Sequence, residues 1–419
     1  MRLIKIGFPV FLAAACFGLP ARAGVFKAAC VRLNITPDRP VRLYGYSMRN
    51  HVSEGVHDSL FMKVLCLDDG DRRFFLVSSD LGVAPANEGF FSRLKKEAGV
   101  ERECLMWTAT HSHSAPTMGQ ENGDYADRVR DQCLRGILQA KSALAPAKLG
   151  YTVGIALAGL NRRAKYPDTT RLGKNPKGPM DRDLGIIKIE RMDGSPMAMV
   201  ANHAVHGTAL FATNYRISGD APGIAEAYVE KKLGAPVLFV NGACGNIDPL
   251  FATVDSFAMG NHFDIAWFEQ LLGEPIWVAQ SMVETSADVR LRTARVVIDL
   301  PRDPRKPPRN SAPPGPVIPV SVQFLSINGL IIFAAPLEMF CDIAMDIKEH
   351  SPFDRTFFFG YCNGSLGYLP TRNAYPKGGY EIGVTPFLDT AEAVFRERVL
   401  AEIVKQYRKT TPGESPEKY

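Results

Sequence analysis

The sequence predicts an α/β fold with a mixed, partly parallel β-sheet core and flanking helices. Short apolar runs rich in β-branched and aromatic residues stop abruptly at polar residues, as "RFFLVSSD" does at Asp80 and "APVLFVNGACGNID" does at Asp248. Segments whose apolar residues recur at helical spacing lie between several of these runs. Strands that alternate with helices indicate a sheet with parallel pairs and helices packed on its faces.

Six of these runs are expected to be strands that end at a polar side chain. Their last residues are Asp80, His113, His206, Asp248, Glu338 and Tyr368. In an open α/β sheet the ligand crevice lies outside the carboxyl ends of the strands. We therefore expect these side chains, which are far apart in the sequence, to gather at one site.

Two segments between the runs carry helix signals. "NEGFFSRLKKEAG" has apolar residues at helical spacing, and Gly99 ends it. "SGDAPGIAEAYVEKKLG" offers Ser218 or Asp220 as its cap, Pro222 in the first turn and Gly234 as its stop. Both segments are predicted to be helices.

The first residues, 1–23, are expected to be a signal peptide. A positively charged start precedes the apolar run "IGFPVFLAAACFGLP", and small residues precede Gly24 as signal peptidase requires. The run is short for a retained membrane anchor and contains Pro9. Cys16 after "LAAA" leaves lipoprotein cleavage as the alternative. The mature protein is therefore expected to be secreted or periplasmic.

Residues 24–408 are expected to form one catalytic domain, followed by a flexible tail at 409–419. The proline-dense stretch at 301–319 predicts a long surface loop within that domain. Seven cysteines follow the leader, an odd number without C-x-x-C spacing. Most are expected to be buried thiols, and the sequence does not decide any pairing.

The composition argues for a globular protein that does not bind nucleic acid. The 419 residues are 46% hydrophobic and 22% charged, which is enough apolar material for a large core. The net charge is only +5, and Lys and Arg are scattered among nearly as many Asp and Glu. No basic stripe of the kind that follows a nucleic-acid backbone is present.

Two histidine segments and one glutamate are candidates for a metal site. His111 and His113 stand in "THSHSAP", and His203 and His206 stand in "NHAVHG". Each single histidine can equally be a satisfied structural residue. Glu338 is a buried acid if its strand is central, which requires an ion pair or a bound cation. The alternative is that Glu338 caps the helix that follows.

Other catalytic patterns fit less well. The spacing of the histidines does not match the H-E-x-x-H helix of zinc proteases, and the paired-metal phosphoesterase motifs are absent. Cys244 on the "GACGNID" turn, with His206 as its base, is an alternative nucleophile, although it lacks the G-x-C-x-G frame.

Taken in order, the motifs resemble those of the neutral (non-lysosomal) ceramidase catalytic domain, from about Gly45 to about Glu381. The matching segments are "GVHDSLFMKVLCL", "LVSSDLG", "TATHSHSAP", "LNRR", "NHAVHGT", "SGDAPG", "GNIDP", "APLE" and "GYCNGSLGY…GGYE". The resemblance implies one Zn²⁺ ion, held by His111, His206, Glu338 and Tyr368. It further implies that His113, Arg162 and Tyr380 surround the scissile amide.

The implied zinc chemistry is hydrolysis by an activated water. Zinc lowers the pKa of a bound water to about 7, so hydroxide is available near neutral pH. His113 and Tyr380 would donate hydrogen bonds to the oxyanion or protonate the leaving amine. Iron or manganese would also accept these ligands.

The chain departs from the family pattern at three places. It reads "GNIDPL" where the family has G-D-V-S-P-N, so Asp248 replaces a serine treated as catalytic and Asn246 replaces an aspartate. Our hypothesis is that Asp248 is a general base or an additional metal ligand. Ala115 stands where the family has glycine, and the chain ends where an additional C-terminal domain of the family would begin.

The predicted function is that of a secreted zinc-dependent hydrolase that cleaves a linear amide, with N-acylsphingosine as the substrate that the resemblance implies. The expected partners are a small-molecule or lipid amide and, transiently, a membrane surface. One alternative is hydrolysis of another amide, an ester, a peptide or a sugar-linked substrate on the same metal site. The other is a non-catalytic binding module that keeps the fold.

Overall fold

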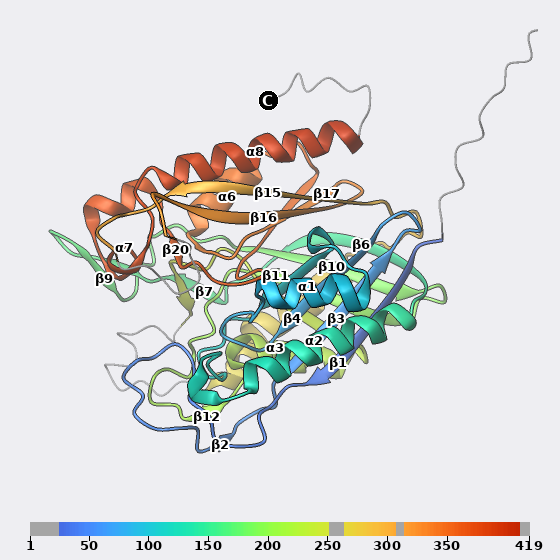
Figure 1. The fold of residues 1–419 in the computed structure, drawn as a ribbon, viewed down its shortest axis with the longest axis horizontal. Helices are drawn as coiled ribbons and strands as arrows, with labels where there is room; N and C mark the ends of the chain where they lie inside the picture. The colour runs from blue at the N-terminus through green and yellow to red at the C-terminus, as the bar shows by residue number, and fades with distance from the viewer. Residues whose placement is uncertain (1–24, 251–263, 307–313, 411–419) are drawn as a thin grey trace, which may run out of the picture.

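The computed structural model describes residues 25–250, 264–306 and 314–410. In these ranges two β-sheets pack face to face, and helices cover the outer face of each sheet (Figure 1). The expected α/β architecture with a mixed sheet is confirmed. The expected signal peptide at 1–23 and most of the expected tail lie outside the described residues.

The first sheet has eight strands in the order β13-β11-β10-β6-β1-β3-β4-β5. The pairs β11–β13 and β4–β5 are parallel, and the other neighbours are antiparallel. The strands are β1 (Lys27–Asn34), β3 (Phe61–Asp68), β4 (Arg73–Ser79), β5 (Leu105–Ala109), β6 (Ala145–Ile155), β10 (Asp183–Arg191), β11 (Pro196–His203) and β13 (Val237–Asn241).

This sheet curls so that its two edge strands, β5 and β13, approach each other. The Asn241 side chain at the end of β13 donates to the Thr110 carbonyl at 3.0 Å, and Ser78 Oγ in β4 donates to the Phe239 carbonyl in β13. Every residue of β5 and of β13 is buried, as the nearly continuous apolar runs predict. The curl brings the carboxyl ends of β5, β11 and β13 together.

The second sheet has four strands in the order β15-β16-β17-β19, of which β17 and β19 are parallel. The strands are β15 (Leu291–Pro301), β16 (Val317–Ile327), β17 (Leu330–Ala334) and β19 (Arg355–Phe359). The loop predicted at 301–319 is therefore shorter than expected, because Pro301 pairs with Val317 and Asp299 pairs with Pro319. β17 pairs with β16 only from Gln323 onward, so at Pro319 β16 has β15 as its single partner strand. The missing N–H of Pro319 is tolerated there because no second strand needs it.

Helices cover both sheets on their outer faces (Figure 1). α1, α2, α3 and α5 pack on the first sheet, and α6 and α8 pack on the second. The helices are α1 (Glu88–Arg93), α2 (Tyr125–Ser142), α3 (Asp220–Leu233), α5 (Glu274–Gln280), α6 (Cys341–Glu349), α7 (Tyr380–Val384) and α8 (Ala391–Thr410). Short 3-10 or π-helical turns are at Leu94–Ala98, Arg102–Cys104, Gln120–Asn122, Ile265–Trp267, Glu269–Gly273 and Arg372–Lys377. None of the helices in the described ranges is both long and apolar enough to span a bilayer.

Both helices expected from sequence signals are present. α1 continues into a π-helical turn that stops at Gly99, where φ is 66°, and α3 stops at Gly234, where φ is 71°. Gly219 occupies the cap position of α3, and the two predicted cap side chains bond to amides of its first turn: the Ser218 hydroxyl accepts from the Asp220 amide at 2.9 Å, and Asp220 Oδ1 accepts from the Ala221 amide at 2.8 Å. α8 runs to Thr410, beyond the domain end expected at 408.

Pairs of very short strands lie outside the two sheets. They are β2 (Gly55–Val56) with β12 (Arg216–Ile217), β7 (Gly159–Asn161) with β14 (Ile247–Pro249), β8 (Arg163–Lys165) with β9 (Thr170–Leu172), and β18 (Glu338–Met339) with β20 (Tyr368–Leu369). The seven cysteines of the described ranges are all free thiols, and all but Cys30 are buried, as expected.

Candidate metal centre

The two histidine segments meet where β5 and β11 end. The amide of His113 donates to the Gly207 carbonyl at 2.8 Å, and Ser112 forms an isolated parallel bridge with Gly207. One nitrogen from each of His111, His113 and His206 then lies within 4.8 Å of the others. The predicted gathering of strand-end side chains is therefore present for the histidines, but Asp80 is not part of this group, and its carboxylate accepts a hydrogen bond from the Phe61 amide instead.

Backbone carbonyls fix the orientation of two of these rings. His111 Nδ1 lies 2.6 Å from the Gly82 carbonyl, and His206 Nδ1 lies 2.7 Å from the Cys244 carbonyl. Because a carbonyl oxygen only accepts, each Nδ1 carries a proton and donates it, and each Nε2 keeps its lone pair. This is the arrangement that metal-ligating histidines generally have.

Glu338 faces both Nε2 atoms. Its Oε2 lies 3.5 Å from His111 Nε2 and 3.6 Å from His206 Nε2. His206 Nε2 and Glu338 Oε2 are buried without a hydrogen-bond partner among the described residues. Buried acceptors that point at one another are unfavourable unless a cation lies between them. The three side chains therefore fit a divalent ion with nitrogen and oxygen ligands.

Burial keeps this cluster in the protonation state that a metal requires. It lowers the pKa of His206 to about 3, so the imidazole is neutral at physiological pH. Burial acts to raise the pKa of Glu338, but the neighbouring His111 and His206 lower it well below its usual range. Neutral imidazoles and an ionised carboxylate are the ligand forms that bind zinc.

His113 belongs to the same cluster. Its Nε2 lies 3.2 Å from His111 Nε2, and its ring packs edge-on against Tyr44 and Tyr46 with centroids 5.3 and 5.1 Å away. The segment is not extended, because His111 has a φ of 61° and the chain turns there. His113 is thus placed where it can be a third nitrogen ligand as well as a group on the substrate side.

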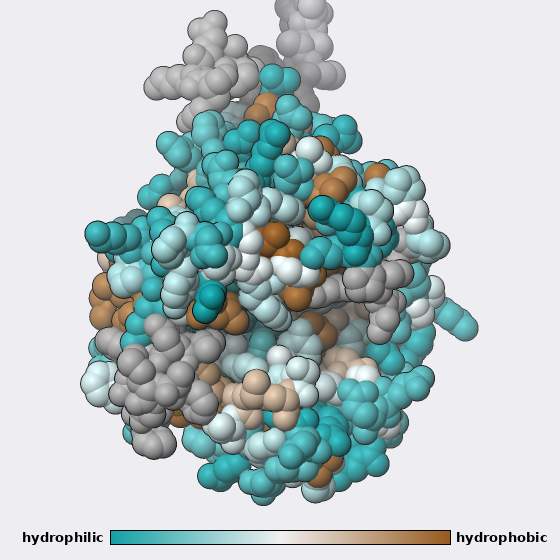
Figure 2. Space-filling model, turned by 90° about the vertical axis from the view of Figure 1, so that its left-hand side faces the viewer, coloured by the Kyte–Doolittle hydropathy of each residue, from teal (hydrophilic) through white to brown (hydrophobic). Residues whose placement is uncertain are grey.

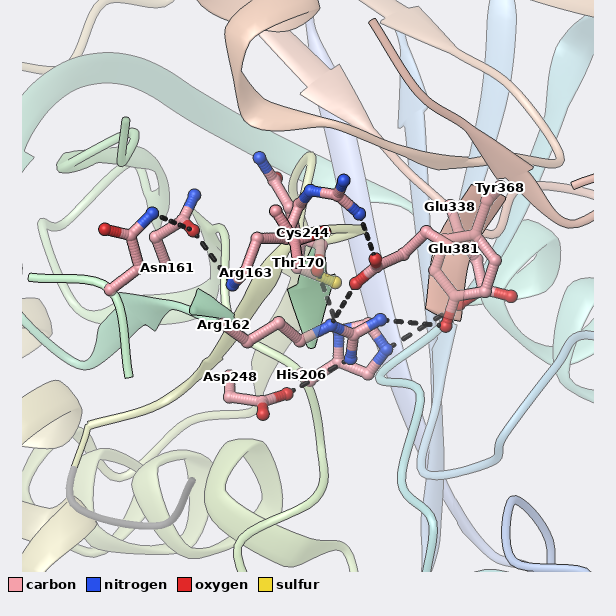
Figure 3. A network of polar contacts seen from close by, with 12 residues as sticks. Asn161, Arg162, Arg163, Thr170, His206, Cys244, Asp248, Glu338, Tyr368 and Glu381 are labelled. Atoms are coloured by element: carbon pink, nitrogen blue, oxygen red, sulfur yellow. Dashed lines mark hydrogen bonds and ion pairs between the residues drawn. The ribbon is translucent and has the colours of Figure 1, made fainter. Parts of the chain in front are cut away.

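A second network surrounds Arg162, which lies between β7 and β8 (Figure 3). Its guanidinium donates to Asp248 Oδ1 at 3.1 Å, to Glu381 Oε1 at 2.9 Å and to the Tyr368 hydroxyl at 3.0 Å. Burial acts to lower the pKa of Arg162, but Tyr368 and the two carboxylates raise it well above its usual range. Glu381 also pairs with Arg163, so two buried cations face two buried anions.

Pairing of β18 with β20 sets Tyr368 beside Glu338. Burial raises the pKa of the Tyr368 phenol well above its usual range. Tyr380, the first residue of α7, packs edge-on against Tyr368 with ring centroids 5.9 Å apart and is 48% exposed. Both tyrosines line the same cleft as the histidines.

Asp248 lies in β14, which pairs with β7. Its carboxylate is bonded to Arg162 and is outside the group of histidine nitrogens. The eight residues predicted for the site are thus all located in the two linked clusters. The roles assigned to them individually stay predictions.

Two residues of the site were missed by the sequence interpretation. Glu381 bridges two arginines, and the only signal for it is its position directly after Tyr380 in "GGYE". The buried Arg49 donates to the carbonyls of Tyr44 and His113 at 2.8 and 2.6 Å. No local pattern predicts this role, because its acceptors are backbone carbonyls rather than side chains.

Two alternative interpretations are wrong. Burial raises the pKa of the Cys244 thiol to about 12, and His206 bonds to its backbone carbonyl rather than to its sulfur, so Cys244 is no activated nucleophile. Glu338 does not cap α6, because that helix begins at Cys341 with Phe340 at its cap position.

A cleft of about 550 Å³ opens onto His111, His113 and Glu338. Figure 2 shows the face on which α7 and β20 lie; it is hollowed across its middle, and both hydrophilic and hydrophobic residues surround the hollow. The cleft is lined by Arg42, Leu43, Tyr44, Gly45, Tyr46, Ser47, Arg49, His111, His113, Thr117, Glu121, Glu338, Tyr368 and Tyr380.

Comparison with known proteins gives one consistent result. The family model for "Neutral/alkaline non-lysosomal ceramidase, N-terminal" matches residues 32–242, about half of the chain. The neutral ceramidase of Pseudomonas aeruginosa is 26% identical over 275 residues, which cover 59% of this chain and 40% of that protein. Neutral ceramidase A of Dictyostelium discoideum is 24% identical over 219 residues, which cover 46% of this chain and 30% of that protein.

The fold agrees with a solved structure. The crystal structure of neutral ceramidase from Pseudomonas aeruginosa superposes with a TM-score of 0.75 at 19% identity, over 93% of this chain and 76% of that one. The matched region spans less than half the length of the curated relatives.

Proposed function

Because the chain belongs to the neutral/alkaline non-lysosomal ceramidase family, we propose that it is a zinc-dependent hydrolase of linear N-acyl amides. The observation that carries the proposal is that His206 Nε2 and Glu338 Oε2 converge beside His111. Both atoms are buried without partners among the described residues, and Glu338 and His111 line an open cleft. By its similarity to neutral ceramidases, the substrate is an N-acylsphingosine or a related lipid amide.

The ion would be held by His111, His206 and Glu338, with Tyr368 as the fourth proposed ligand. When bound, zinc supplies hydroxide near neutral pH and acts as a Lewis acid toward a carbonyl oxygen. The buried carbonyls of Gly82 and Cys244 hold the two imidazoles in the tautomer that the ion needs.

The remaining polar groups of the cleft would act on the substrate. Tyr380 is exposed at the cleft wall and would donate a hydrogen bond to the oxyanion. Arg162, kept charged by Asp248 and Glu381, lies behind Tyr368 and would stabilise the same negative charge. Burial and the neighbouring His111 and His206 lower the pKa of His113 well below its usual range, so His113 would be a neutral imidazole that donates a hydrogen bond to the substrate.

A substrate screen tests the proposal directly. The purified protein is assayed against N-acyl amides that include a ceramide, before and after chelation and with zinc, iron or manganese added back. We expect amide cleavage that chelation removes and zinc restores. A protein that binds no metal and cleaves nothing would favour the non-catalytic binding module, and ester cleavage alone would favour the other hydrolase.

We also propose that residues 1–23 are removed as the protein leaves the cytoplasm. Support comes from the charged start, the apolar run and the small residues before Gly24. N-terminal sequencing of the exported protein should begin at residue 24, and an intact N-terminus in the cytoplasmic fraction would contradict this.

The His111→Ala and His113→Ala variants test whether His111 binds the metal and His113 acts on the substrate. We expect His111→Ala to lose most of its bound metal. His113→Ala should retain metal while its rate falls on the order of a hundredfold, because one general acid or oxyanion donor is worth about this much. Metal analysis and kcat separate the two results. Equal metal loss in both variants would make His113 a third nitrogen ligand.

The Asp248→Asn variant tests the general-base hypothesis. If Asp248 accepts a proton, kcat should fall about a hundredfold or more while bound metal is retained. Arg162 keeps Glu381 as its counter-ion in this variant, so the fold is expected to survive. Thermal denaturation serves as the control for folding, and wild-type kcat in a folded Asp248→Asn protein would refute the base role.

Gly45→Ala tests whether the position of His113 matters. A Cβ at Gly45, where φ is +94°, would lie 2.1 Å from His113 Nδ1. We expect the ring to move and kcat/KM to fall about tenfold or more. Gly55→Ala is the matched control, since φ there is +150° but no atom lies within 4 Å of the new Cβ. Equal losses in the two variants would indicate backbone strain rather than a displaced His113.

A further inference from the structure

The cleft contains an arginine without a carboxylate partner. Arg42 lines the cavity together with His113 and Tyr368. In the described parts of the chain no carboxylate oxygen lies within 4.0 Å of its guanidinium, and its only side-chain hydrogen bond is a long one, 3.5 Å, to the Arg49 carbonyl. The neighbouring arginines differ, because Arg39 pairs with Asp124 and Arg49 is occupied by four carbonyl oxygens.

The backbone of Arg42 is rigidly placed. Its amide donates to Asn122 Oδ1 at 2.7 Å, and its carbonyl accepts from the Thr117 amide and from Asn122 Nδ2, each at 2.9 Å. Leu43, the next residue, forms a bridge with Pro116, three residues beyond His113. The Arg42 backbone is therefore held beside the histidine segment by contacts that do not use its side chain.

The acidic groups of the cleft do not neutralise this cation. Glu338 faces His111 and His206. Glu121 is exposed and accepts a hydrogen bond from the Thr117 hydroxyl, and no cation lies within 4.0 Å of it in the described ranges. A half-buried guanidinium with free donors matches a carboxylate or another small oxyanion, which it binds through two parallel hydrogen bonds.

We propose that Arg42 forms an anion-binding subsite, and that the preferred substrate is an N-acyl amide carrying a negatively charged group. This inference rests on the proposed amidohydrolase function and narrows its substrate class. A neutral ceramide offers Arg42 only uncharged oxygens, which form weaker hydrogen bonds with a guanidinium than a carboxylate does. An anionic amide would place its scissile bond at the histidines and its charge at the arginine of the same cleft.

A matched pair of ligands tests the subsite. N-dodecanoyl-β-alanine and its primary carboxamide differ only in the charge of the terminal group. Both ligands are tested on wild type, Arg42→Gln and Glu121→Gln. If a protein cleaves the amide, its KM and kcat are measured; if it does not, the Kd is measured by calorimetry. Wild type should prefer the carboxylate about tenfold or more, which is the usual worth of a charge-assisted pair.

Arg42→Gln should lose this preference while it binds the carboxamide like wild type, because the loop is held by backbone atoms. Thermal denaturation confirms its fold, and Arg42→Lys should restore part of the preference. Glu121→Gln should strengthen carboxylate binding, because a nearby negative charge is removed. An equal preference in wild type and Arg42→Gln would overturn the subsite, as would stronger binding of the carboxamide to wild type.

The two proposals fail in different ways. Cleavage of neutral amides without any carboxylate preference would refute the proposed subsite and support the proposed hydrolase function. If the Kd values show a carboxylate preference that depends on Arg42 but no amide is cleaved, the subsite is supported and the hydrolase function is refuted.

Discussion

His206→Ala is expected to abolish metal binding and to lower kcat/KM for amide hydrolysis by at least about a hundredfold. A bound ion is worth several kcal/mol of transition-state stabilisation. His206 Nε2, one of the atoms proposed to hold it, is buried without a hydrogen-bond partner among the described residues. The pKa of His206, lowered to about 3 by burial, means that its Nε2 lone pair is available throughout the neutral range. Metal analysis of the purified variant is the first measurement, and steady-state kinetics is the second.

His203→Ala is the matched control. His203 is buried at the end of β11, three residues before His206, and its Nδ1 lies 2.9 Å from the Asp183 carbonyl, but it is not in the histidine group. Removing either imidazole leaves a cavity of similar size, so both variants should lose stability. Only His206→Ala should lose metal. Equal metal contents in the two variants would contradict the assigned centre.

Arg162→Ala should destabilise the protein by about 3–5 kcal/mol and lower kcat/KM by about a hundredfold or more. Its removal leaves Asp248 without this ion pair and leaves Glu381 with Arg163 alone, in an environment where those side chains are at most 9% exposed. Breaking a buried pair by deleting one partner costs about this much, since the remaining charge stays desolvated. Urea denaturation measures the free energy of unfolding, and kinetics at a temperature well below the transition measures the rate.

Arg93→Ala provides the surface comparison. Arg93 also pairs with two carboxylates, Glu97 and Asp131, but its side chain is 46% exposed. Exposed pairs of this kind contribute less than about 1 kcal/mol, so this variant should remain close to wild type in both measurements. A folded Arg162→Ala protein with wild-type kcat/KM would show that the guanidinium has no role in the reaction.

Much of the local structure could be predicted because its causes are local. The spacing of apolar residues and the stops at Gly99 and Gly234 determine where helices form, and α1 and α3 are observed there. The structure of the proline-rich stretch could not be predicted in the same way, because Pro319 is tolerated within a strand only where β16 lacks a second partner strand. That condition depends on strand lengths elsewhere in the sheet.

The site itself was predictable in its membership and not in its geometry. The polar ends of the apolar runs marked the two histidine segments and Glu338 as candidates, because parallel strands place their carboxyl ends at one edge. The resemblance to a family then selected His111, His206 and Glu338 from these candidates, and the structure brings the three side chains together. The residues that support these side chains, Arg49 and Glu381, were not predicted. Arg49 acts through backbone carbonyls, and Glu381 acts through two arginines that are more than two hundred positions away.

The sequence by itself determined the α/β class, the polar residues at the strand ends and the resemblance to a family, since each depends on residue type and order. Only the tertiary structure decided which atoms face one another. The curl of the first sheet brings β5 to β13, and carbonyls from Gly82 and Cys244 orient the two imidazoles. The same folding leaves Arg42 in the cleft without a carboxylate partner among the described residues. Distances between side chains come from long-range packing, which no local pattern of residues specifies.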